Sequence, residues 1–154
     1  MKKDFSQPLN INETTHYELL VQDSATKEFL LFRSNNPAED WYYNLTIDIK
    51  NGEQLSLALT KQLYEAGLVL NHYHELARQT MVNFSFVDAT PGTEKSEICL
   101  LAVVNSRADA SLERTKFVSI EKILPLLLQN PSYSPTVEIG VAKLLAEKSV
   151  SDPS

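Results

Sequence analysis

The stretch NGEQLSLALTKQLYEAGLVL, at residues 51–70, decides the fold because its hydrophobic residues follow a helical period. Leucines recur at every fourth position, at Leu55, Leu59 and Leu63. Residues four apart lie on one side of an α-helix, so these leucines form an apolar stripe. Gly67 stands where glycine commonly ends a helix, because glycine adopts the left-handed backbone conformation without steric cost. The pattern predicts a helix over residues 53–66 that packs on a sheet through its leucines.

Segments rich in β-branched and aromatic residues lie on both sides of this helix and predict strands. Their residue ranges are 15–23, 28–34, 41–49, 68–89, 97–105 and 116–119. Within the fourth of these, the polar residues 71–75 predict a break. Near the C-terminus Pro125 is expected to shorten one helix, and Ser134 is expected to cap a second helix that starts at Pro135. The order of strands, helix, strands and helices predicts an α+β fold with a mixed or antiparallel sheet.

Length and composition limit the class of protein. The chain has 154 residues, of which 43% are hydrophobic and 22% charged, as in an ordinary folded domain. This length suits a single domain over residues 1–154, with loose ends at about 1–12 and 148–154. A net charge of −6 argues against a nucleic-acid partner, since that affinity depends on clustered Lys and Arg. No apolar run reaches the roughly 20 residues of a membrane span, and no signal peptide is apparent, so a cytoplasmic location is expected.

The helical stretch, extended to residues 47–68, resembles the Nudix box, whose pattern is G-x5-E-x7-R-E-U-x-E-E-x-G-U with U a bulky aliphatic residue. The residues that agree with this pattern are Glu53, Leu63, Glu65, Gly67 and Leu68. A strand with Trp41 precedes the box, as in the family, and residues 116–127 resemble the strand and helix that occur late in many members. The resemblance covers about residues 15–147. It implies a Nudix-like α/β/α sandwich with a mixed sheet.

The departures from the pattern fall on the residues that carry the family's chemistry. Nudix hydrolases cleave a pyrophosphate bond in a nucleoside diphosphate linked to another group. They usually need Mg²⁺ or Mn²⁺, and such ions prefer several oxygen ligands. Here Ile47 replaces a glycine, Lys61 the arginine and Gln62 a glutamate, and a gap of one residue removes the glutamate that pairs with Glu65. The resemblance is therefore to a degenerate Nudix box.

The resemblance implies a site built from the residues that remain. Glu65 and Glu53 are the candidate catalytic residues, and together with Gln62 they are the candidate metal ligands. Trp41 and Tyr43 are candidate substrate-binding residues, because aromatic side chains can stack on bases. Packing in the core is the alternative explanation of both aromatic residues.

Two functions remain open. The first is a divergent Nudix hydrolase with weak or lost pyrophosphohydrolase activity, which would use Mg²⁺ or Mn²⁺ if active. The second is a non-catalytic Nudix-fold module that binds a nucleotide-like ligand or a protein partner. Glu94 and Glu97, which flank a turn before a strand, could supply missing acids to the first. The expected partner is a small nucleotide-like ligand rather than nucleic acid or membrane, and a homodimer is compatible with the sequence.

Overall fold

The computed structural model describes residues 14–34, 36–50, 52–83, 93–108 and 112–151, without the side chains of 81–83, 93–95 and 150–151. The strands are β1 (Thr14–Asp23), β2 (Phe29–Arg33), β3 (Tyr42–Tyr43), β4 (Leu45–Lys50), β5 (Leu68–Asn83), β6 (Thr93–Ser106) and β7 (Thr115–Val118). The helices are α1 (Leu55–Glu65), the 3₁₀ helix η2 (Ile120–Lys122), α2 (Ile123–Leu127) and α3 (Pro135–Ser151). The predicted loose ends at 1–12 and 152–154 lie outside the described residues. Residues 148–151 form the last turn of α3.

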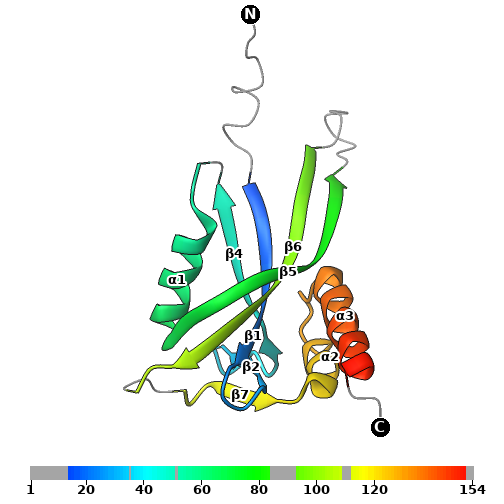
Figure 1. The fold of residues 1–154 in the computed structure, drawn as a ribbon. Coiled ribbons are helices and arrows are strands. Elements are labelled where there is room, and N and C mark those ends of the chain that lie inside the picture. The colour runs from blue at the N-terminus through cyan, green and yellow to red at the C-terminus, as the bar shows by residue number, and fades with distance from the viewer. Residues whose placement is uncertain (1–13, 35, 51, 84–92, 109–111, 152–154) are drawn as a thin grey trace, which may run out of the picture.

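The strands form one mixed sheet of seven strands (Figure 1). β1 lies in the middle of the strand order β3-β2-β1-β6-β5: one of its edges pairs parallel with β6, which in turn pairs antiparallel with β5. On its other edge, β1 pairs antiparallel with β4 along residues 14–19 and with β2 along residues 21–22. β3 and β7 both pair with β2. The α+β class with a mixed sheet is therefore confirmed.

For two of the predicted strands, the structure places the interruptions differently. Residues 41–49 were expected to form one strand, but they form β3 and β4, which are separated at Asn44. The buried side-chain amide of Asn44 donates to Glu18 Oε1 at 2.8 Å, and this inward hydrogen bond interrupts the strand. The break predicted at residues 71–75 is wrong, because β5 continues through them. Two register shifts against β6 absorb the local irregularity instead.

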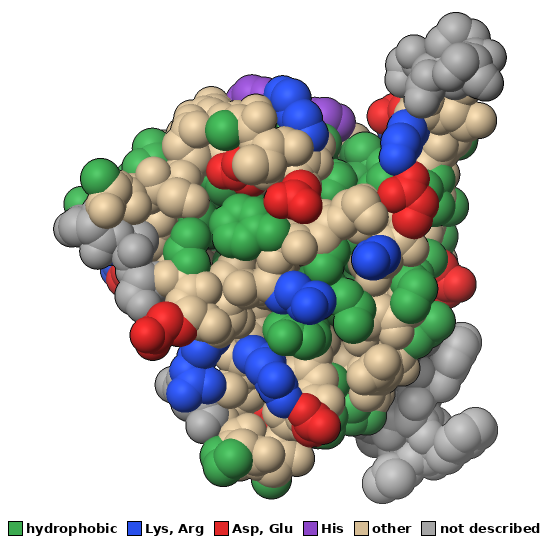
Figure 2. All heavy atoms as spheres, turned by 90° about the horizontal axis from the view of Figure 1, so that it is seen from below, with side chains coloured by type: hydrophobic (Ala, Val, Ile, Leu, Met, Phe, Trp, Pro, Cys, Tyr) green, Lys and Arg blue, Asp and Glu red, His purple; other side chains and the backbone are tan. Residues whose placement is uncertain are grey.

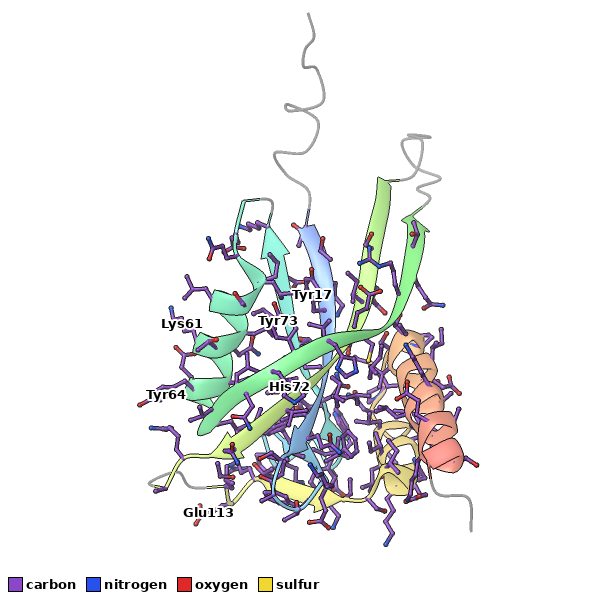
Figure 3. The ribbon with its side chains drawn as sticks, viewed as in Figure 1. Tyr17, Lys61, Tyr64, His72, Tyr73 and Glu113 are labelled. Atoms are coloured by element: carbon purple, nitrogen blue, oxygen red, sulfur yellow. The ribbon has the colours of Figure 1, made fainter. Side chains whose placement is uncertain are left out.

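Helix α1 covers one face of the sheet. Its side chains Leu59 and Leu63 are fully buried in a cluster with Leu19 and other sheet residues. Figure 3 shows Tyr17 and Tyr73 in the space between α1 and the sheet, where they pack against the same cluster. The helix was therefore predicted correctly, as were its buried leucines.

The end of α1 also follows the prediction. Gly67, with a φ of 89°, comes directly after the C-cap residue Ala66. This positive φ is in the region that favours glycine, so the chain turns from α1 into β5 without backbone strain.

Helices α2 and α3 cover the opposite face (Figure 1). Val137 and Val141 of α3 are buried against a second cluster that contains Leu20 and Cys99. The backbone N–H of Thr136 donates to Ser134 Oγ at 3.1 Å, which confirms the predicted helix cap. The two covered faces make the α/β/α sandwich that the resemblance implied.

Candidate functional site

The two acids of the box-like segment lie at opposite ends of α1. Glu53 precedes the helix by two residues, and Glu65 is its last residue. The eleven residues of α1 span about 15 Å, since an α-helix rises about 1.5 Å per residue. Mg²⁺ holds its oxygen ligands at about 2.1 Å, so two carboxylates that share an ion lie within about 4 Å of each other. Both side chains are exposed, and one ion does not reach both.

Glu53 and Gln62 make hydrogen bonds that hold the loop before α1 and the helix itself in place. Glu53 Oε1 accepts a hydrogen bond from the backbone N–H of Lys50 at 2.7 Å. Gln62 Nε2 donates to the carbonyl of Thr46 at 2.9 Å and so ties α1 to β4. Lys61 is exposed, and Figure 3 shows it on the side of α1 that faces away from the sheet. The donor set along α1 therefore does not fit a shared Mg²⁺ or Mn²⁺ ion.

The candidate substrate-binding residues, in contrast, lie together. Trp41 and Tyr43 line a cavity of about 290 Å³. The other residues of its lining come from β1, from the segment around β3 and β4, and from the connection between α2 and α3: Glu18, Glu39, Asn44, Thr46, Asn130 and Ser132. This lining combines aromatic surface with carboxylate, amide and hydroxyl groups. Such a mixture suits a polar ligand with one flat apolar part.

A group of titratable side chains lies on the sheet face that α3 covers. Successive residues of a strand point to opposite faces, and Leu20 belongs to the cluster under α3. Glu18 and His16 therefore share that face. The parallel pairing of β1 and β6 places Glu97 beside His16. The imidazole and the two carboxyl groups bring one ligand atom each within 4.8 Å of the others.

The charges in this group are strongly coupled. His16 Nε2 forms a short ion pair with Glu18 Oε2, and His16 Nδ1 lies 2.7 Å from Asp48 Oδ1. The hydrogen bond to Glu18, with a further contribution from Asp48, raises the pKa of His16 to about 9. Burial, together with the carboxylates of Glu18 and Glu97, raises the pKa of the Cys99 thiol to about 12. The site is therefore a partly buried region of excess negative charge, and Cys99 is not a nucleophile there.

Sequence reasoning found part of this group. Glu97 was considered as a reserve acid, and the structure places it away from α1, on the other face of the sheet. The side chain of Glu94, the second reserve acid, lies outside the described side chains. Glu18 and His16 were missed, although their spacing of two on a predicted strand was a usable signal, because such residues share a face.

One face of the molecule carries charged side chains of both signs (Figure 2). Figure 2 shows acidic and basic side chains interspersed among hydrophobic ones on one face, over its described residues, rather than a field of Lys and Arg. Among the described residues, no helix is long and apolar enough to span a membrane.

Comparison with solved structures identifies the fold. A NUDIX hydrolase from Nitrosomonas europaea is similar with a TM-score of 0.58 and 14% identity, over 88% of this chain and 90% of that one. The NUDIX domain of NrtR from Shewanella oneidensis, complexed with ADP ribose, is similar with a TM-score of 0.54 and 12% identity, over 94% of each chain. The Ap4A hydrolase of C. elegans is similar with a TM-score of 0.50 and 19% identity, over 87% of this chain and 97% of that one.

These likenesses show that the chain has the Nudix fold. No family model and no curated protein matches its sequence.

Proposed function

We propose that this protein is a divergent Nudix-type protein that binds a nucleotide-like ligand in the cavity beside Trp41 and Tyr43. Its pyrophosphohydrolase activity is weak or lost. One contrast carries the proposal: the aromatic cavity is formed, whereas Glu53 and Glu65 are held at opposite ends of α1.

The chemistry of the cavity favours the nucleoside part of such a ligand. Trp41 offers a flat face for a base, and Asn44, Asn130 and Ser132 carry groups that hydrogen-bond to base edges or ribose hydroxyls. The carboxyl groups of Glu18 and Glu39 repel an unshielded phosphate. A nucleoside diphosphate would therefore place its phosphates toward the cavity opening. The ADP ribose bound by the NrtR domain is a ligand of this class.

The arrangement of α1 supports weak hydrolysis. Cleavage of a pyrophosphate requires neutralisation of developing negative charge, which divalent ions supply when several acids hold them. Glu65 can contribute one carboxylate, and Gln62 contributes at most a neutral oxygen, because its amide nitrogen is engaged with Thr46. Removal of one preorganised charge-stabilising group commonly costs about 10²–10³ in rate. We therefore expect Mg²⁺- or Mn²⁺-dependent turnover well below 1 s⁻¹.

A titration with ADP ribose and Mg²⁺, followed by NMR, tests the binding half of the proposal. The indole N–H of Trp41 and the amide of Tyr43 should shift, and Trp41→Ala should weaken binding at least tenfold. Tyr64→Ala is the matched control, because Tyr64 is exposed on the outer side of α1 (Figure 3) and should leave affinity unchanged. If millimolar ADP ribose, sugar nucleotides and dinucleoside polyphosphates shift nothing at the cavity, a protein-binding role replaces the nucleotide-binding one.

A turnover screen with the same compounds tests the catalytic half. Glu65→Gln is the diagnostic variant, because Glu65 is the acid that remains at the end of α1. Turnover of about 1 s⁻¹ or more, abolished by Glu65→Gln, would show that the protein is a competent enzyme despite its altered box.

A further inference from the structure

We propose that His16, Glu18 and Glu97 bind one divalent transition-metal ion, of the class that includes Zn²⁺ and Mn²⁺, on the face of the sheet that α3 covers. This site is separate from the acids of α1 and does not depend on the proposed nucleotide binding. Its three residues come from two neighbouring parallel strands, where the register sets His16 beside Glu97.

Contacts with neighbouring residues orient the three side chains, and one ligand atom of each lies within 4.8 Å of the other two. His16 Nδ1 is paired with Asp48, so Nε2 is the nitrogen that meets Glu18. Asn44 Nδ2 donates to Oε1 of Glu18, and Oε2 of Glu18 meets His16 Nε2. A histidine whose other nitrogen is bonded to a carboxylate is the usual arrangement at a protein metal site.

Glu97 is anchored in the same manner from the opposite side. Its Oε1 accepts hydrogen bonds from Ser134 Oγ and, at 2.6 Å, from Thr136 Oγ1. Both hydroxyl groups are buried at the start of α3, and Thr136 is also bonded to Gln79 at 2.8 Å. These contacts fix the carboxyl group, and one oxygen of Glu97 lies within 4.8 Å of the ligand atoms of His16 and Glu18. Each prospective ligand is thus oriented by a partner that is not itself a ligand.

The donor set identifies the class of ion. One imidazole nitrogen and two carboxylate oxygens suit Zn²⁺ or Mn²⁺ better than Ca²⁺, which prefers oxygen ligands alone. Ligand atoms bound at about 2.1 Å in a tetrahedral site are about 3.4 Å apart. Separations of up to 4.8 Å therefore contract by about 1.4 Å at most when an ion binds, whereas the hydrogen-bonded His16 Nε2 and Glu18 Oε2 move apart to admit it.

The local charge also favours a cation. Among the described residues, the ion pairs of Glu18 and Asp48 are both with His16, and no Lys or Arg is paired with Glu97. A divalent ion would take the place of the proton shared by His16 and Glu18, and that proton would leave to solvent. Glu18 also lines the cavity beside Trp41 and Tyr43, so an ion has a route from solvent.

Calorimetric titration of the chelator-treated 154-residue chain with Zn²⁺, without nucleotide, tests the proposal. We expect one ion per chain, and at least tenfold weaker binding in both His16→Gln and Glu97→Gln. The matched control is His74→Gln, because His74 is an exposed histidine of β5, and this variant should bind Zn²⁺ as the unsubstituted protein does. Binding that survives both cluster variants, but is lost when His72 and His74 are both replaced by glutamine, would move the site to β5 and overturn the proposal.

A second measurement on the unsubstituted chain avoids any loss of folding in the variants. Paramagnetic Mn²⁺ broadens the amide signals of nearby residues in an NMR spectrum. We expect broadening around His16 on β1 and Glu97 on β6 at substoichiometric Mn²⁺. Broadening confined to the exposed residues of α1 or β5, or no Zn²⁺ binding at 100 µM, would refute the site. Neither result bears on the nucleotide titration, so the two proposals fail independently.

Discussion

Replacement of Leu59 by alanine is expected to destabilise the protein by about 2–5 kcal/mol. The side chain is fully buried between α1 and the sheet, in a cluster with Leu19, Leu63 and Leu100. Part of the cost is the lost transfer of apolar surface out of water, and the rest comes from the cavity that the neighbours leave unfilled. Leu57 provides a matched control on the same helix, because it is 68% exposed. Leu57→Ala should change stability by no more than about 0.5 kcal/mol.

Urea unfolding followed by circular dichroism measures both variants, and an unchanged slope shows that the unfolded state is unaffected. For a chain of this length, a loss of about 3 kcal/mol lowers Tm by roughly 6–12 °C. Equal costs for Leu57→Ala and Leu59→Ala, or a cost below about 1 kcal/mol for Leu59→Ala, would refute the packing of α1 on the sheet. The placement of Glu53 and Glu65 at opposite ends of α1 would then be refuted as well.

Three further predictions concern the core, the end of α1 and the charged group. Gly140→Ala should destabilise by about 1–3 kcal/mol, because its Cβ would lie 2.7 Å from the buried Cys99 Sγ; Cys99→Ala in the same chain should recover most of the loss in thermal melts. Gly67→Ala should cost about 1–2 kcal/mol in urea unfolding, because its φ of 89° strains any residue with a Cβ. In chelator-treated protein, the raised pKa of His16, about 9 in the folded chain, means that the folded state holds the proton more tightly than the unfolded state. His16 should therefore add about 1–3 kcal/mol to the free energy of unfolding below pH 6.5, and this stabilisation should be lost as the pH rises through 9. Urea midpoints measured from pH 6 to 10 check this loss; His16→Gln should flatten it, and His74→Gln should leave it unchanged.

The local elements were largely predictable from the sequence. The four-residue spacing of Leu55, Leu59 and Leu63 predicted α1 and its buried side, because helical periodicity depends on neighbouring residues alone. Gly67 and Ser134 predicted where α1 ends and α3 begins for the same reason. The unbroken course of β5 was missed, because register shifts against β6 are a property of the pair of strands rather than of one segment.

The candidate site depends partly on the sequence alone and partly on the tertiary structure. The sequence by itself led to the prediction of a degenerate box, because comparing residues 47–68 with a pattern requires only residue identities. It also brought Trp41 and Tyr43 under consideration. The convergence of His16, Glu18 and Glu97 was decided by the tertiary structure alone. About 80 residues separate His16 from Glu97 in the sequence, and the register of the parallel pairing of β1 and β6 determines that these side chains meet.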